Sequence, residues 1–404
     1  EAASDASLNV YAPLLSSGVQ KTLIGLIESS KNGGSTVDSR RLREYCYSAL
    51  SVLAPRRPKL FAGNLELPRM CFEGLLEDDN EFRASAQEAL SSLATAYAHS
   101  PPDVLDQIMR MLLKYATSRE YRARHCAVQM STRIFPVSHV PTRYLCMLVA
   151  ADSRQEVRFA ANSGLSGRDY NNKSTADSTT SGSSSSKGNP WDFSQTTIDR
   201  KKLKKENFAD FIEMVEYITT KNRFFQLKAR EAAEALKYIG KCFAVISKDK
   251  VTSITKIKDN ENNESYLNAI QKYADMLNSA LTTDPAVNGA SVLFCQATTC
   301  VADLAEVVPE TVGPTFSTED SIRRLKSWLS NTNEELRTAA ARVLKLTVRW
   351  IPDKNLLQLT DFLLTNAKDN SPSKLTAKHG SLHALGSIVV GLQTEICPRV
   401  KIVN

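Results

Sequence analysis

The stretch that decides the fold is DNEFRASAQEALSSLATAYA, residues 79–98. Its apolar residues at positions 86, 89, 90, 93 and 97 recur every three or four residues, so they fall on one face of a helix. Asp79 and Asn80 are typical helix N-cap residues, and Glu81 places a negative charge in the first turn, which the helix dipole favours. The segment therefore predicts an amphipathic helix that begins at a short polar turn.

The same opening recurs along the chain, before Ala-rich or apolar helical segments, at Asp38–Arg43, Arg119–Arg122, Asp152–Arg158 and Asn331–Arg337. The arginines at 43, 83, 122 and 158 are separated by 40, 39 and 36 residues, and a lysine follows the arginine at 337 by 37 residues. A fixed period near forty residues is typical of an α-solenoid. We expect these arginines to tie one repeat to the acidic cap of the next, at Arg43, Arg83, Arg122, Arg158 and Arg337.

Partner helices lie between these openings, for example over 104–113 and 322–329, and each carries one apolar stripe. A single pair of helices cannot cover such stripes, but consecutive stacked pairs can. The period and the Asp-to-Arg opening favour HEAT repeats over the 34-residue tetratricopeptide repeat. The sequence thus predicts an all-α fold, a HEAT-repeat (armadillo-type) α-solenoid superhelix.

Residues 168–206 interrupt the repeats. A Ser-rich tract and the basic run RKKLKK at 200–205 dominate this segment, which has too few apolar residues to form a core. We predict a HEAT-repeat block over 1–167, a flexible loop with the basic run over 168–206, and a second block over 207–404 that continues the solenoid. A shorter loop is predicted over 256–265.

Composition narrows the class of protein. The net charge of +7, from 51 basic and 44 acidic residues, is small for 404 residues and does not suggest a nucleic-acid-binding protein. No apolar run is long enough to cross a membrane, and the first residues do not resemble a signal peptide. We expect a cytoplasmic protein. A nuclear location is also possible from the sequence, because the run at 200–205 is either a nuclear localisation signal or the solvated start of a helix.

Candidate chemistry is sparse. His379 and His383 are four residues apart and would share a helix face, but no third metal ligand is indicated. The eight cysteines contain no C-x-x-C pair, and Cys295 and Cys300 are expected to be core thiols. No phosphate-binding loop and no paired nucleophile and base occur. We therefore expect no catalytic, cofactor-binding or metal-binding residues, and a function carried by the surface.

Several blocks also resemble a known family. Residues 80–97, 122–161, 321–340 and 367–386 are similar, in the same order, to segments of the large HEAT-repeat proteasome adapter and scaffold proteins. The most characteristic are HVPTRY at 139–144 and HGSLHALG at 379–386. The resemblance implies an internal fragment of a non-catalytic protein that bridges the proteasome core and regulatory particles and links them to other cellular components.

Two other interpretations remain open from the residues alone. One is a nuclear transport receptor, although the acidic inner-helix runs expected for that class are not evident. The other is the regulatory arm of a larger enzyme whose catalytic part lies elsewhere.

Overall fold

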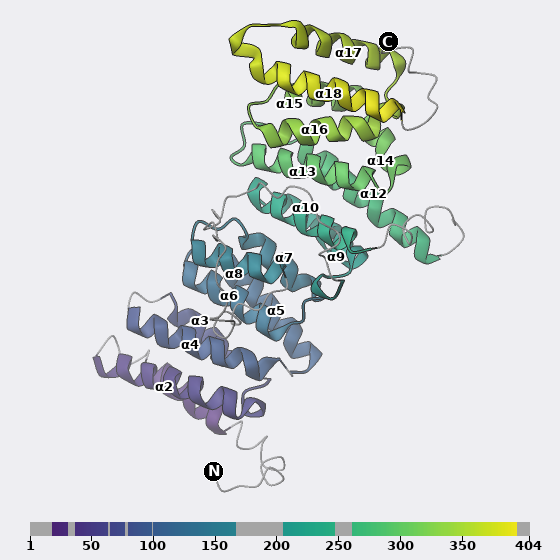
Figure 1. Cartoon of the computed structure of the whole chain (residues 1–404). Coiled ribbons are helices and arrows are strands. Elements are labelled where there is room, and N and C mark those ends of the chain that lie inside the picture. Colours follow the sequence, from purple (N-terminus) through teal and green to yellow (C-terminus); the bar gives the residue numbers. More distant parts are fainter. Residues whose placement is uncertain are drawn as a thin grey trace, which may run out of the picture. The chain divides into compact units, whose positions relative to one another are not determined.

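The computed structural model of the chain describes residues 18–30, 37–63, 65–76, 80–98, 100–166, 205–246 and 261–393. Within these ranges the regular elements are helices, and no strand occurs (Figure 1). Contacts divide the chain into two compact units, Glu1–Ser174 and Thr175–Asn404, here called unit 1 and unit 2. The all-α prediction is confirmed.

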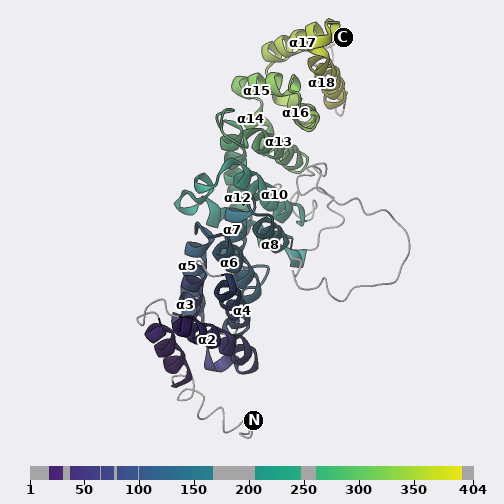
Figure 2. The same cartoon turned by 90° about the vertical axis from the view of Figure 1, so that its left-hand side faces the viewer.

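In unit 1 the helices form two layers that alternate along the chain (Figure 2). The first layer holds the helix over 18–30, then α3 (Glu66–Gly74), α5 (Pro102–Ala116) and α7 (Val140–Val149). The second layer holds α2 (Val37–Arg56), α4 (Asn80–Tyr97), α6 (Tyr121–Ile134) and α8 (Gln155–Leu165). A short 3-10 helix, η1 (Pro58–Leu60), follows α2. Each second-layer helix packs on the next one along the chain, which is the arrangement of stacked HEAT repeats.

Unit 2 repeats this plan. Its second layer stacks α10 (Ala229–Ala244), α13 (Ala290–Ala305), α16 (Glu334–Thr347) and α18 (Leu375–Gln393). Its first layer holds α9 (Phe211–Thr219), α12 (Glu261–Leu281), α14 (Pro309–Phe316), α15 (Glu319–Leu329) and α17 (Asp353–Lys368). Short 3-10 helices are η4 (Lys205–Asn207), η5 (Thr220–Gln226), η6 (Val348–Trp350) and η7 (Pro372–Lys374).

The helices begin where the sequence supplies a cap. The side chain of Asn333 accepts hydrogen bonds from the amides of Glu335 and Leu336 at 2.8 and 3.2 Å, and α16 follows directly. Asp210 caps α9 in the same way through the amides of Ile212 and Glu213. Such caps satisfy amides that have no partner inside the helix.

Small residues let second-layer helices approach closely. Ala86 and Ala89 of α4 are fully buried, and so are Ala297 and Ala302 of α13. In α18, a Cβ placed on Gly380 would lie only 1.8 Å from the Leu329 carbonyl oxygen, at the end of α15. That position therefore requires glycine for packing reasons.

The two predicted loops have different outcomes. Most of the loop at 168–206 lies outside the described residues, although its last two residues belong to η4. The loop predicted over 256–265 is wrong from Glu261 onward, because α12 begins there. The buried face of α12 starts only at Tyr266, and Glu264 and Ser265 are exposed. A solvated first turn has polar residues throughout, so it looks like a loop in the sequence.

Candidate binding surface and its framework

The repeated arginines close the turns between paired helices. In unit 2, Nη1 of Arg337 donates to the carbonyl oxygens of Asn331 and Thr332 at 2.8 and 2.9 Å. In unit 1, Nη1 of Arg158 donates to the carbonyl oxygens of Asp152 and Ser153. In both cases the acceptors lie six and five residues before the arginine. The guanidinium therefore fixes the turn between the first and second helix of its own repeat.

In the repeat that precedes Arg158, the residue with this geometry is Arg124 and not Arg122. Nη1 of Arg124 donates to the carbonyl oxygens of Ser118 and Arg119, both at 2.9 Å, again six and five residues earlier. Arg122 instead reaches the preceding repeat, where its Nη1 donates to the side-chain oxygen of Asn80 at 3.1 Å. The sequence period therefore selects Arg122, two residues before the arginine that closes the turn.

The other two predicted arginines lie on the α2–α4 side of unit 1. Arg43 is buried, and its guanidinium carbon is 4.7 Å from the centre of the Phe82 ring on the next second-layer helix. Arg83 is half-buried on α4, next to Phe82. Stacking of a guanidinium on an aromatic face holds neighbouring repeats together.

The expected tie to the acidic cap of the next repeat is made by Arg124. Its Nε and Nη2 donate to the two carboxylate oxygens of Asp152 at 2.5 and 2.8 Å, and Asp152 opens the next repeat. Burial raises the pKa of Asp152, but the hydrogen bonds from Arg124 and from the amide of Arg154 outweigh it and hold this pKa below its ordinary value. A forked, largely buried pair of this kind is stronger than an exposed one.

Unit 2 has a corresponding link between second-layer helices. Arg342 of α16 pairs with Asp303 of α13 at 2.9 Å and with Glu306, the C-cap residue of α13, at 2.7 Å. In unit 1, Arg133 of α6 donates to the Ser91 carbonyl oxygen of α4 at 3.1 Å. These links between repeats were not predicted, because their partners lie 36 to 42 residues apart and neither end stands in the repeated opening.

The histidine and cysteine candidates stay apart from one another. His379 and His383 are both exposed on α18, and among the described residues no three His, Cys, Asp or Glu side chains are placed to hold a metal ion. The seven described cysteines are buried. Burial raises the pKa of Cys126 and Cys295 to about 12, and of Cys146 and Cys300 to about 11. A thiol with such a pKa is a poor nucleophile at neutral pH.

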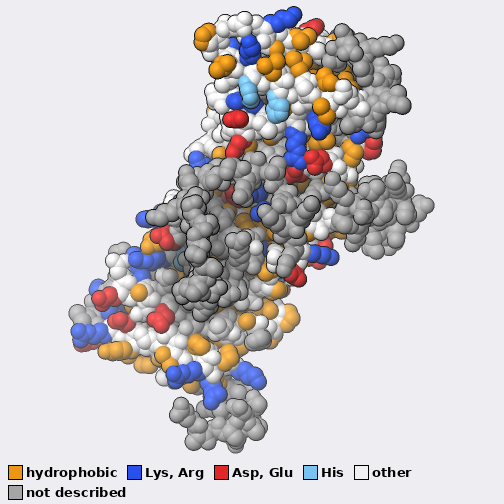
Figure 3. Space-filling view, viewed as in Figure 1, with side chains coloured by type: hydrophobic (Ala, Val, Ile, Leu, Met, Phe, Trp, Pro, Cys, Tyr) orange, Lys and Arg blue, Asp and Glu red, His pale blue; other side chains and the backbone are white. Residues whose placement is uncertain are grey.

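The surface carries an apolar stripe on the last described helices. Figure 3 shows hydrophobic side chains gathered over α17 and α18. On each of these helices, exposed apolar side chains recur every seven residues with exposed fractions of 38 to 68%: Leu357 and Leu364 on α17, and Leu375, Leu382 and Val389 on α18. On α2 of unit 1, Tyr45 and Val52 are likewise seven residues apart and exposed. Exposed apolar side chains that gather on a surface mark a place for further packing or binding. None of the described helices is long and apolar enough to span a bilayer.

Stacked helical pairs, turn-closing arginines and exposed helix faces define an α-solenoid of the HEAT and armadillo class. Two family models match the chain: "Proteasome component ECM29, N-terminal" over residues 1–149, and "ECM29, ARM-like repeats" over residues 244–396. The chain belongs to the ECM29 family.

Among curated proteins, the chain is similar to the human "Proteasome adapter and scaffold protein ECM29". The two are 25% identical over 386 residues, which cover 86% of this chain and 19% of that relative. The chain therefore spans about a fifth of the length of the curated relative that it matches.

Similar solved structures include Kap121p and an engineered protein. Kap121p bound to RanGTP is 14% identical with a TM-score of 0.38, covering 98% of this chain and 36% of that one. The engineered protein is 15% identical with a TM-score of 0.32, covering 95% and 96%. Scores this low carry no functional argument.

Proposed function

We propose that this chain is a non-catalytic part of a proteasome adapter, which bridges or stabilises the core and regulatory particles and links them to other cellular components. The observation that carries the proposal is the ordered family match, with the N-terminal model on unit 1 and the ARM-like repeat model on unit 2. The human relative is named as a proteasome adapter and scaffold. These matches favour an adapter over a nuclear transport receptor or the regulatory arm of an enzyme.

The geometry suits a scaffold. Arg124 with Asp152 in unit 1, and Arg342 with Asp303 in unit 2, each fix one repeat against its neighbour within the unit. Within each unit, a stack of repeats offers a large partner several moderate contacts at once. The polar links stabilise the array itself, which leaves outward-facing side chains available for partners.

Affinity purification of the full-length native protein, under conditions that preserve ATP, tests the proposal. Mass spectrometry of the purified material is expected to find subunits of both the core and the regulatory particle. Recovery without subunits of either particle would refute it.

We further propose a cytoplasmic location, with entry into the nucleus promoted by the basic run at 200–205. Its support is the sequence alone: four lysines in six residues, at 201, 202, 204 and 205. Fluorescent tagging is expected to show nuclear signal that falls when these lysines are replaced by alanine. Unchanged nuclear signal would assign the run to another role.

A further inference from the structure

Arginines gather around the ring of Tyr121 at the edge of unit 1 where α6 and α8 begin. These two helices pack against each other (Figure 1). The guanidinium carbon of Arg154, at the start of α8, lies 4.8 Å from the centre of the Tyr121 ring, and that of Arg122 lies 5.5 Å from it. Arg119 is exposed on the turn that leads into α6, two residues before the tyrosine. Two neighbouring repeats thus contribute positive charges to one stretch of surface.

These three arginines are not neutralised by the chain. No carboxylate in the described ranges lies within 4.0 Å of their guanidinium nitrogens. Nη1 of Arg122 donates to the side-chain oxygen of Asn80, which is neutral, at 3.1 Å. The surface therefore carries positive charge that an acidic partner can neutralise.

The carboxylates closest to these arginines in the sequence have other hydrogen-bond donors. Both oxygens of Asp152 accept from Arg124, at 2.5 and 2.8 Å. A side-chain oxygen of Glu120 accepts from the amide of Arg122 at 3.3 Å, as the N-cap of α6. The positive ends of the α6 and α8 dipoles lie at the same edge and add to its potential.

The geometry suits an extended chain with several carboxylates. A guanidinium that stacks on an aromatic ring keeps the N–H groups at its edge for an anion. The guanidinium carbons of Arg122 and Arg154 lie no more than about 10 Å apart, because both are close to the centre of one ring. In an extended peptide, side chains at positions i and i+2 are on the same side and about 7 Å apart. Two flexible acidic side chains at that spacing can reach both arginines at once.

We propose that this surface, formed by Arg119, Tyr121, Arg122 and Arg154 and here called the Tyr121 surface, binds an extended acidic segment of a partner protein. Glutamate or aspartate side chains at alternate positions pair with the arginines, and the segment crosses the tyrosine ring. Tyrosine and arginine are enriched where protein interfaces carry most of their binding energy. Glu156 is exposed two residues after Arg154, and its charge disfavours a continuous phosphate backbone more than a peptide with spaced carboxylates.

This surface is independent of the proposed adapter function, because it is defined by the arginines and not by the family. A negative result in the peptide experiment below leaves the adapter function standing. Loss of proteasome binding would likewise leave the proposal for the Tyr121 surface intact.

The experiment uses the 404-residue chain and a dye-labelled octapeptide that alternates Glu and Ser, titrated by fluorescence anisotropy. Salt at about 150 mM screens exposed charges that are more than about 8 Å apart. The neutral control peptide has Gln in place of Glu, and a third peptide carries one phosphoserine in that neutral sequence. The acidic peptide is expected to bind at least about tenfold more tightly than the neutral peptide, and more tightly than the phosphopeptide.

The double variant Arg122→Gln with Arg154→Gln tests the role of the cluster. It keeps the arginines that close the turns, and it is expected to weaken binding of the acidic peptide at least about tenfold. The matched control, Arg56→Gln with Arg110→Gln, removes the same charge from two other exposed positions of unit 1 and is expected to bind within about twofold of the native chain. Circular dichroism of both variants shows whether the fold is retained, and the comparison of peptides on the native chain needs no variant.

Three results would overturn the proposal. The first is equal binding of the acidic and the neutral peptide to the native chain. The second is an equal effect of the two double variants, which would assign binding to net charge and not to the Tyr121 surface. The third is tighter binding of the phosphopeptide than of the acidic peptide, which would make this a phosphate site.

Discussion

Replacing Gly380 by alanine should destabilise the end of unit 2, although alanine is the better helix former. A Cβ at this position would lie 1.8 Å from the Leu329 carbonyl oxygen and 2.9 Å from its carbon. Both atoms are backbone, so no side chain can rotate away, and α18 must move. Gly386 lies on the same helix and is exposed, and a Cβ there meets nothing within 4 Å.

The two substitutions should therefore act in opposite directions. Overpacking against a rigid neighbour lowers stability by about 3 kcal/mol at the upper end of its usual range. The higher helix propensity of Ala raises stability by about 1 kcal/mol relative to Gly. Gly380→Ala should then destabilise α18 by about 2 kcal/mol. Gly386→Ala brings only the gain in helix propensity, with no overpacking, and should stabilise α18 by about 0.5–1 kcal/mol.

Native-state hydrogen exchange with mass spectrometry is the suitable assay, because a long repeat array opens locally and does not unfold as a single two-state unit. Peptides from α16 to α18 should exchange faster in Gly380→Ala and slower in Gly386→Ala, while peptides from α4 to α6 stay unchanged. Equal protection in the two variants would refute the close approach of α18 to α15.

Three further predictions concern single side chains. Arg337→Lys should lower local stability by about 1–2 kcal/mol, because one ammonium cannot hold both turn carbonyls as the guanidinium does. Faster hydrogen exchange in peptides from α15 and α16 would show this loss. Burial lowers the pKa of His139 to about 4, below its unfolded value of about 6.5. As the pH falls from 6.5 to 4, the unfolded chain takes up the proton first, so the free energy of unfolding of unit 1 should fall by about 1–2 kcal/mol. In denaturant titrations, His139→Gln should show a smaller fall over the same pH range. Cys126 and Cys300 should react with a thiol reagent at pH 8 only after denaturant is added, and rapid labelling of the folded chain would contradict their burial.

The fold was predictable because each repeat shows its period and its helix openings locally. Asn333, followed by acidic residues and an Ala-rich segment, predicts α16 without any long-range information. The repeated arginines could be found in the sequence, but their role could not: we expected ties to the acidic cap of the next repeat, whereas Arg158 and Arg337 bind turn carbonyls of their own repeat. The arginines that close the turns stand four residues after the N-caps Glu120, Arg154 and Asn333. Counting four residues from the N-cap therefore identifies Arg124, whereas the average repeat period selects Arg122.

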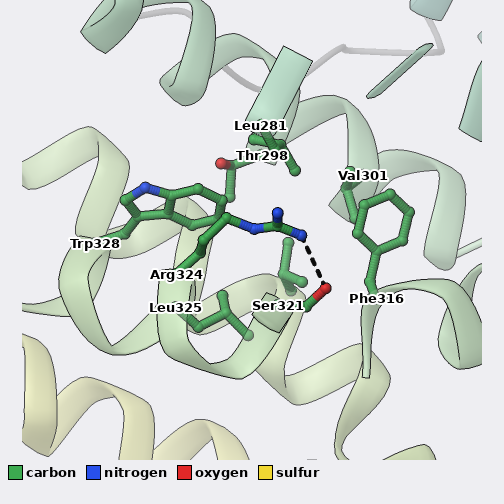
Figure 4. A pocket seen from close by; sticks show the side chains of 9 residues that line it. Leu281, Thr298, Val301, Phe316, Ser321, Arg324, Leu325 and Trp328 are labelled. Atoms are coloured by element: carbon green, nitrogen blue, oxygen red, sulfur yellow. Dashed lines mark hydrogen bonds between the residues drawn. The ribbon is translucent and has the colours of Figure 1, made fainter. Parts of the chain in front are cut away.

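The surroundings of Arg324 could not be predicted in this way. Arg323 and Arg324 are adjacent and chemically identical, yet one is exposed beside Asp320 and the other reaches between five helices (Figure 4). The helical phase that separates them depends on how α15 packs against α12 and α13. Asn278, the partner of Arg324, lies 46 residues away in the sequence, and nothing local connects the two.

Reconstitution from purified components tests whether this chain, as proposed, contacts the proteasome directly. The 404-residue chain, immobilised, is exposed in turn to purified core particle, regulatory particle and the assembled proteasome, with an unrelated α-solenoid as control. Saturable retention of at least one particle by the chain, and of none by the control, is expected. Retention of no particle, with the chain folded by circular dichroism, would contradict it.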